Sequence, residues 1–125
     1  MLISEAHYGD VDKMSLLIDR GANVNGVALD CWTPLSKAAD AGQLKAVRLL
    51  LARGANINQT SSGLTPLFCA ALRGHLNVAR LLVEKGGRLN LNPVLKKNFL
   101  DRVYSFQNQG LISLVTQVMT SEGSL

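Results

Sequence analysis

Residues 65–86 read TPLFCAALRGHLNVARLLVEKG, and residues 33–54, at a step of 32, read TPLSKAADAGQLKAVRLLLARG. The two stretches share a Thr-Pro-Leu start, an Ala-Ala pair, a central glycine and a Leu-Leu pair. Pro66 suits the first position of a helix, where its fixed φ matches and its missing N–H needs no partner, and Thr65 suits the N-cap. Gly74 follows the first apolar stretch, as glycines that end helices do. The pattern therefore predicts two short helices in each stretch.

The same spacing continues toward both ends of the chain. One position holds a leucine four times, at steps of 33, 32 and 33: Leu2, Leu35, Leu67 and Leu100. A period of this length is typical of stacked repeats. We therefore expect one domain over residues 1–120, followed by a polar, flexible tail at 121–125. Its four units are expected at about 1–29, 30–61, 62–94 and 95–120.

The repeated residues resemble the ankyrin repeat, with Thr-Pro-Leu, Ala-Ala, Gly-His-Leu and Leu-Leu-x-x-x-Gly-Ala in that order. The resemblance covers residues 2 to about 92 well and the remainder by register alone. It implies an all-α solenoid of about four helix-turn-helix units, with short β-turn fingers and polar terminal caps. The matching residues are Thr33, Pro34, Leu35, Ala38, Ala39, Gly42, Leu49, Leu50, Gly54 and Ala55, then Thr65, Pro66, Leu67, Ala70, Ala71, Gly74, His75, Leu81, Leu82 and Gly86.

Several residues depart from this pattern. The family's histidine after Thr-Pro-Leu, which helps to join neighbouring turns by hydrogen bonds, is Ser36 and Phe68 here, so we expect a less stable array. Lys13 replaces an apolar residue in the first unit, as an N-terminal cap requires. Val103 and Tyr104 take the Ala-Ala positions of the last unit, which suits a cap whose larger side chains cover the core. The alternative interpretation is that this chain was cut from a longer array of repeats.

Composition excludes several classes of protein. The 125 residues are 47% hydrophobic and 18% charged, which excludes a disordered chain. No stretch approaches the ~20 apolar residues of a membrane-spanning helix, and the N-terminus lacks a signal-peptide pattern. Two cysteines are too few for a disulfide scaffold, so we expect reduced thiols in an intracellular protein, cytoplasmic or nuclear.

The side chains that carry catalysis are sparse. The chain has two histidines; we expect His75 to connect two helices and His7 to take an exposed position. His75 and Cys69 do not have the spacing of zinc ligands, and the sequence contains no glycine-rich phosphate loop. We therefore expect a protein that is not an enzyme and that holds no metal and no cofactor.

The excess positive charge lies in the second half of the chain. The net charge of +4 arises within residues 63–125, whereas residues 1–62 are neutral. Solvated surface is the simplest interpretation, and attraction of an acidic partner or a phosphate-rich surface is the alternative. Stacking aromatics are not interleaved with these basic residues, so the sequence argues against a nucleic-acid groove.

The resemblance also implies where a partner binds. Ankyrin repeats use the concave surface formed by the turns and the exposed sides of the first helices. Trp32, Leu64 and Tyr8 predict an exposed apolar strip, which is typical of interaction sites, although Trp32 could instead pad the neighbouring turn. His7 and Cys69 share these variable positions. The predicted protein-binding residues are Tyr8, Leu29, Trp32, Lys37, Asp40, Ala41, Leu64, Leu72 and Arg73.

We therefore predict a monomeric interaction module, or scaffold, that binds another protein. One alternative is a regulatory domain that docks within a longer protein, and another is a binder of acidic lipid or nucleic acid through the basic C-terminal half. Asn25 and Asn58 match the turn asparagine that some hydroxylases modify in the family. Stabilisation of their own turns is the preferred interpretation of these asparagines.

Overall fold

The chain forms a stack of helix pairs. A computed structural model describes residues 2–28, 32–60, 63–91 and 93–123. These ranges contain eight helices, which confirms the all-α prediction. The helices are α1 (Leu2–Tyr8), α2 (Val11–Asp19), α3 (Pro34–Asp40), α4 (Leu44–Ala52), α5 (Pro66–Leu72), α6 (Leu76–Glu84), α7 (Pro93–Ser105) and α8 (Gln109–Ser121).

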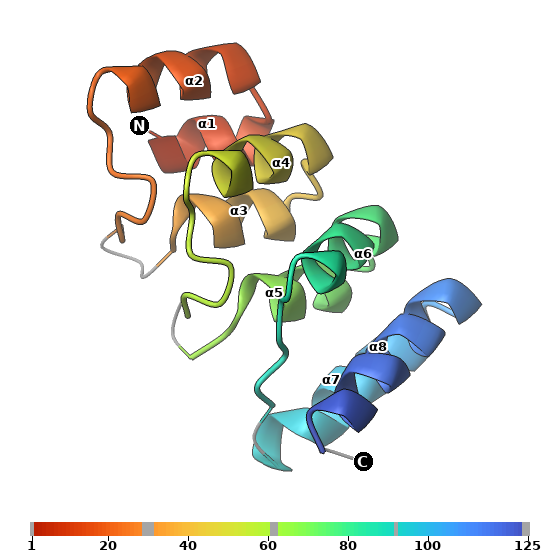
Figure 1. The fold of residues 1–125 in the computed structure, drawn as a ribbon. Helices are drawn as coiled ribbons and strands as arrows, with labels where there is room; N and C mark the ends of the chain where they lie inside the picture. Colours follow the sequence, from red (N-terminus) through yellow and green to blue (C-terminus); the bar gives the residue numbers. More distant parts are fainter. Residues whose placement is uncertain (1, 29–31, 61–62, 92, 124–125) are drawn as a thin grey trace.

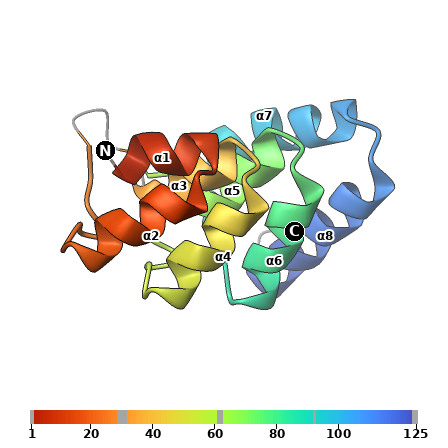
Figure 2. The same ribbon diagram turned by 90° about the horizontal axis from the view of Figure 1, so that it is seen from above.

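The helices are arranged in two layers. Each odd-numbered helix is followed by an even-numbered helix that packs beside it, and successive pairs are displaced along the stack (Figure 1). Seen from above, α1, α3, α5 and α7 form one row, and α2, α4, α6 and α8 form the other (Figure 2). The two ends of the chain lie at opposite ends of the stack in Figure 1. This arrangement is the solenoid predicted from the repeat.

Threonine side chains begin the odd-numbered helices of the two central units. Thr65 Oγ1 accepts a hydrogen bond from the Phe68 N–H at 3.2 Å, which confirms the predicted N-cap. Thr33 Oγ1 accepts from the Ser36 N–H at 3.1 Å, and Ser36 Oγ accepts from the Thr33 N–H at 3.0 Å. This reciprocal pair satisfies two N–H groups that have no partner within the helix. Ser36, in place of the family's histidine, therefore stabilises its own helix start.

Small side chains let the odd-numbered helices lie close together. Ala38, Ala39, Ala70 and Ala71 are completely buried. Because alanine has no side chain beyond Cβ, α3 can approach both α1 and α5 without leaving voids between the helices. Larger buried side chains from the even-numbered helices complete the core: Met14, Val47, Leu50, Val78, Leu82, Leu111, Val115 and Met119.

Two aromatic rings join the third and fourth units. Phe68 occupies the repeat position of the family's histidine and is 4% exposed, and Phe99 of α7 is 1% exposed. Their ring centroids lie 4.8 Å apart at an interplanar angle of 24°, a stacked arrangement that adds to the gain from burial. Ring packing thus replaces the polar network that the family pattern would place here.

Polar side chains also connect one unit to the next at the ends of the odd-numbered helices. Gln43 Nε2 donates to the His7 carbonyl at 3.1 Å. One unit later, at the same repeat position, His75 Nε2 lies 2.9 Å from the Asp40 carbonyl. Because a carbonyl can only accept, Nε2 of His75 carries the proton. His75 therefore has a structural role, as predicted, but its ring connects two units and not the two helices of its own unit.

The asparagines of the turn fingers form a second set of links. Asn25 Oδ1 accepts from the Asn56 N–H at 2.7 Å, and Asn58 Oδ1 accepts from the Arg88 N–H at 2.9 Å. Asn58 Nδ2 also donates to the Gly86 carbonyl at 3.3 Å. Each side chain thus bridges its own finger to the next one along the stack. The expectation that the two asparagines stabilise their own turns is therefore corrected, because these side-chain bonds join neighbouring fingers.

Replacing Asn58 with alanine should lower the free energy of unfolding by about 1 kcal/mol, because the Arg88 N–H loses its acceptor and the Gly86 carbonyl its donor. Urea unfolding followed by circular dichroism measures the change. Asn77→Ala is the control, because Asn77 is exposed on α6 and alanine is the better helix former. Equal stability of the two variants would contradict the structural role of Asn58.

The last unit is longer than the others. α7 begins at Pro93 instead of at the residues equivalent to Thr65 and Pro66, so the predicted boundary between residues 94 and 95 lies inside a helix. The repeat register is nevertheless kept, because Val103 and Leu111 are completely buried. The extra N-terminal turns of α7 therefore lie outside the repeat pattern that predicted the boundary.

The end of the chain is attached to the third unit. α8 continues to Ser121, and Glu122 forms its C-cap. The Glu122 carboxylate accepts from the Leu89 N–H at 2.8 Å and from the Asn90 N–H at 2.9 Å. The expectation of a flexible tail from residue 121 onward therefore does not fit Ser121 and Glu122, because this carboxylate satisfies two backbone donors. Residues 124–125 lie outside the described ranges.

The two ends of the stack carry different surfaces. At the first unit, Lys13 is exposed, as predicted for a polar cap. At the last unit, Val94 is 80% exposed and Tyr104 is 51% exposed. The last unit is thus less polar than the expected cap, because Tyr104 occupies a repeat position where the preceding units bury a small alanine.

Candidate functional site

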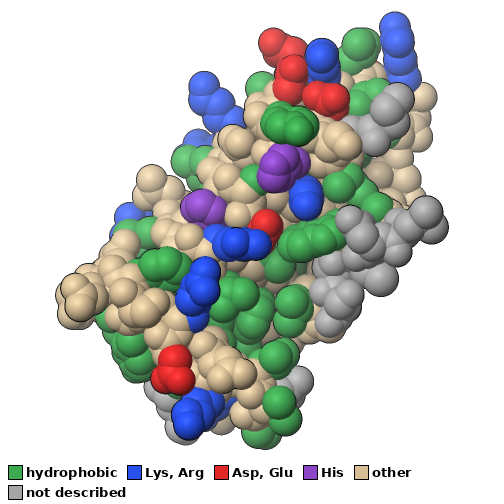
Figure 3. Space-filling view, turned by 180° about the vertical axis from the view of Figure 1, so that it is seen from behind, with side chains coloured by type: hydrophobic (Ala, Val, Ile, Leu, Met, Phe, Trp, Pro, Cys, Tyr) green, Lys and Arg blue, Asp and Glu red, His purple; other side chains and the backbone are tan. Residues whose placement is uncertain are grey.

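The odd-numbered helices present their exposed sides on one face of the stack. Figure 3 shows this face, seen from behind the view of Figure 1. Hydrophobic side chains alternate there with basic and acidic ones and with histidine. The predicted binding residues that the structure describes all belong to this layer or to the turns that precede it.

The predicted apolar strip is less exposed than expected. Leu64 and Leu72 are half-buried and pack against the core. Trp32 is also half-buried, and the Lys37 Nζ lies 4.7 Å from the centroid of its ring. Tyr8, at 74% exposure, is the one member of the strip that stands well into solvent. Leu29 lies outside the described residues.

The structure gathers four of the nine predicted residues around one hollow. The hollow has a volume of about 580 Å³ and crosses the C-terminal ends of α1, α3 and α5. We name it the concave groove; its lining residues are His7, Tyr8, Asp40, Ala41, Gln43, Arg73 and His75. Trp32, Lys37, Leu64 and Leu72 do not line it.

An ion pair crosses the concave groove from one unit to the next. Arg73 Nε donates to Asp40 Oδ1 at 3.0 Å. The Arg73 side chain is 54% exposed, and the Asp40 side chain is 17% exposed. Because the pair is open to solvent on the arginine side, it contributes little to stability, and the guanidinium keeps further donors for another ligand.

His7 is placed differently from the expectation of a surface residue. It is half-buried, and its ring meets that of Tyr8 edge-on, with centroids 5.0 Å apart at 81°. Its Nδ1 is buried and has no hydrogen-bond partner in the described part of the chain. A buried ring nitrogen without a partner costs stability, so packing and not a polar contact holds the His7 ring in place.

Two residues that were not predicted from the sequence, Arg102 and Phe106, extend this row into the last unit. Phe106 is 38% exposed, and the guanidinium carbon of Arg102 lies 5.8 Å from the centroid of its ring. Phe106 occupies the repeat position of Tyr8, Ala41 and Arg73. The register of the leucines could have found it, had that position been followed into the fourth unit.

Cys69 occupies a repeat position that was expected on the binding surface, but its side chain is buried. It is 4% exposed, and burial, with a smaller contribution from Asp40, raises the pKa of its thiol to about 12. The thiolate is the reactive form of cysteine, so this side chain is inert at neutral pH. Cys31 lies outside the described residues.

In a Cys31→Ser background, Cys69 should react with iodoacetamide at pH 8 at least about tenfold more slowly in the folded protein than in urea. Because burial raises the pKa of the Cys69 thiol to about 12 in the folded protein, the protonated thiol favours the folded state. Its contribution to the free energy of unfolding is present below pH ~9 and is lost as the pH rises toward 12. Mass spectrometry of the alkylated chain measures the rate. Equal rates in both states would contradict the burial of the thiol.

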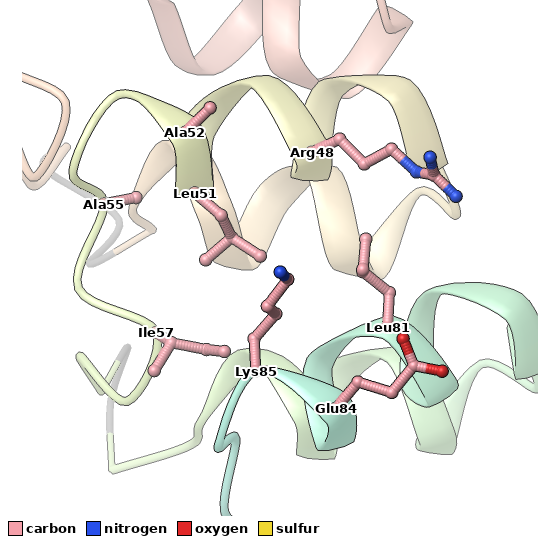
Figure 4. A pocket seen from close by; sticks show the side chains of 8 residues that line it. All are labelled: Arg48, Leu51, Ala52, Ala55, Ile57, Leu81, Glu84 and Lys85. Carbon is pink, nitrogen blue, oxygen red and sulfur yellow. The ribbon is translucent and has the colours of Figure 1, made fainter.

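A second hollow lies on the other layer, between α4 and α6. It has a volume of about 650 Å³, and Figure 4 shows side chains from both helices and from the turn after α4 around it. We name it the α4–α6 groove; its lining residues are Arg48, Leu51, Ala52, Ala55, Ile57, Leu81, Glu84 and Lys85. None of the nine predicted binding residues lines this groove.

Neither hollow has the residues of a metal site. Across the described ranges, histidine, cysteine, aspartate and glutamate side chains form no group of three or more that could hold a metal ion. Among the same residues, no helix has the length and hydropathy to cross a membrane.

The comparisons with known proteins agree with the geometry. The family model described as ankyrin repeats in three copies matches residues 1–93. The chain belongs to the ankyrin-repeat family. A comparison with curated protein sequences finds no match. The ankyrin match covers the first three units and the whole concave groove, whereas nearly all of the longer fourth unit lies beyond it.

Proposed function

We propose that this ankyrin domain binds a partner protein through the concave groove. Ankyrin repeats are generally protein–protein interaction modules and are typically not enzymes. The observation that carries the assignment is the meeting of Tyr8, Asp40, Ala41 and Arg73, contributed by three units, around one hollow. Residues from separate units meet there only when the stack is formed.

The chemistry of the concave groove suits a protein ligand. Tyr8 offers an exposed ring, and arginine and tyrosine are enriched among residues that dominate binding energy. A partner carboxylate can approach Arg73 from the solvent side while Asp40 stays paired, because the Arg73 side chain is 54% exposed and its guanidinium keeps further donors.

We further propose that the domain acts as a monomer, as a non-catalytic scaffold in the cytoplasm or nucleus. The free thiol of Cys69 supports a reducing compartment. Docking within a longer protein would use the same concave groove, with the partner supplied by the same chain. Binding of acidic lipid or nucleic acid would instead depend on the basic residues of the second half of the chain.

Affinity capture from a cell lysate tests the assignment. A Tyr8→Ala, Arg73→Ala double variant should lose proteins that the parent captures. The control is Lys45→Ala with Arg80→Ala, which removes exposed side chains from the even-numbered layer. Both variants are first shown by circular dichroism to remain folded. Equal capture by parent and groove variant would overturn the proposal, and so would losses confined to the control.

A further inference from the structure

The first two units are joined by a cation that meets two acceptors. Arg53 Nη2 donates to Asp19 Oδ1 at 2.6 Å and to Ser15 Oγ at 3.3 Å. Arg53 follows the last turn of α4, and Asp19 is the last residue of α2. The interface between α2 and α4 is thus bridged by a charge-assisted contact at its edge.

The same three positions carry different residues one unit later. By the repeat step of 32, Lys85 is equivalent to Arg53. By the step of 33, Ala52 is equivalent to Asp19 and Arg48 to Ser15. A methyl group thus replaces the carboxylate, and a second cation replaces the hydroxyl. Within the described ranges, neither Lys85 nor Arg48 forms an ion pair.

These three residues line the α4–α6 groove. Its floor is apolar, with half-buried Leu51, Ile57 and Leu81. In Figure 4 the Lys85 side chain extends between Leu51 and Leu81, and Arg48 reaches out along α4. The hollow is therefore an apolar surface that Lys85 crosses and that Arg48 borders. Its Ala52 is the repeat equivalent of Asp19, the carboxylate of the preceding interface.

Glu84 does not supply the missing carboxylate. It is the one acidic residue among those lining the α4–α6 groove, and it forms no ion pair with the described residues. Because Glu84 precedes Lys85 directly on the chain, the two side chains point to different sides of the helix end. Both cations are exposed to solvent, and a carboxylate that paired with them would come from outside the interface.

We propose that the α4–α6 groove binds an acidic, amphipathic segment of a partner protein. A carboxylate of the segment takes the place that Asp19 has in the preceding interface and contacts Arg48 and Lys85. Apolar side chains on the same face of the segment cover Leu51, Ile57 and Leu81. The apolar contact supplies affinity and the two cations select acidic sequence. This site lies on the opposite layer from the concave groove and is independent of it.

Fluorescence anisotropy with a synthetic peptide tests the proposal. The probe is a labelled helical peptide of glutamate, alanine and leucine, about 15 residues long, with its leucines on one face. A peptide in which glutamine replaces every glutamate is the comparison. We expect the acidic peptide to bind at least about tenfold more tightly at low salt. Equal binding of the two peptides, or binding of neither, would overturn the proposal.

Charge reversals locate the binding. Arg48→Glu with Lys85→Glu should weaken binding of the acidic peptide by about tenfold or more. Lys45→Glu with Arg80→Glu makes the same total change of charge on α4 and α6, at exposed residues outside the α4–α6 groove, and should have a small effect. Equal losses from this control would mean that diffuse surface charge binds the peptide, and would overturn the site.

A third variant restores the missing partner. Ala52→Asp places a carboxylate on the unit that lacks it, next to Lys85, so binding of the acidic peptide should fall by several-fold while the fold is kept. Unchanged affinity would contradict the proposed contact.

Binding to vesicles that contain about one third phosphatidylserine is measured as a last comparison. Tighter binding to these vesicles than to the peptide would assign the surface to a membrane instead. The Tyr8→Ala, Arg73→Ala variant should still bind the peptide, which separates this site from the concave groove.

Discussion

Replacing Phe99 with alanine should lower the free energy of unfolding by about 3–5 kcal/mol. Phe99 is 1% exposed and stacks on Phe68 of the third unit, so the change leaves a cavity and removes a ring contact at once. Because each unit in a solenoid is stabilised by its neighbours, the last unit should loosen before the others. Urea unfolding followed by circular dichroism measures the loss, and hydrogen exchange locates it in α7 and α8.

Tyr104→Ala is the matched control, because it removes an aromatic side chain from the same helix at 51% exposure. Its effect should stay below about 1 kcal/mol, since exposed side chains contribute little. If Phe99→Ala were no more destabilising than Tyr104→Ala, the last unit would not be held to the array by the ring stack.

Replacing Gly42 with alanine should lower the free energy of unfolding by about 2–4 kcal/mol. Gly42 has a φ of +73°, which an L-residue adopts at a cost of about 1 kcal/mol or more. Its new Cβ would also lie 2.6 Å from Nδ1 of His75, the residue that contacts the Asp40 carbonyl. Displacement of His75 then breaks a link between the second and third units, which adds about 1 kcal/mol.

Gly54→Ala separates these two costs. Gly54 also has a positive φ, +90°, but nothing lies within 4 Å of the position of a Cβ. We therefore expect only the backbone cost, about 1 kcal/mol. The difference between the two variants, obtained from urea unfolding, reports the contact between units. Equal losses would show that His75 moves aside freely and contributes nothing to the stacking.

The helix starts of the two central units were predictable because their causes are local. Thr65 and Pro66 determine a helix start within a few residues, and the structure shows the expected N-cap. The glycines after α1, α3 and α5 are equally local: Gly9, Gly42 and Gly74. His75 was assigned to a structural role from its place in the repeat, and its contact with Asp40 agrees.

The last unit was predicted less well. The leucine register correctly aligned Val103 and Leu111 with the core, but it contained no information about the extra turns of α7 that begin at Pro93. Glu122 looked like part of a polar tail, because its two hydrogen bonds are to the backbone of residues more than thirty positions earlier. Contacts of that separation leave no local pattern in the sequence.

For the candidate binding residues, the position on a face could be predicted from the sequence, but the exposure of each side chain could not. Sequence position placed Tyr8, Asp40, Ala41 and Arg73 on one face, and the structure joins them around the concave groove. Exposure could not be read from the same pattern. Leu64, Leu72 and Cys69 occupy variable positions of the repeat and are nevertheless drawn toward the core.

The sequence by itself determined the repeat, the helix pairs, the family and the layer on which a partner surface should lie, because helix caps and apolar periodicity act over a few residues. The tertiary structure decided which side chains meet across units. Arg53 pairs with Asp19, whereas its equivalent Lys85 has Ala52 at the matching repeat position, and neither Lys85 nor Arg48 forms an ion pair among the described residues. Whether a charge has a partner depends on distances between helices, and those exist only once the units are stacked.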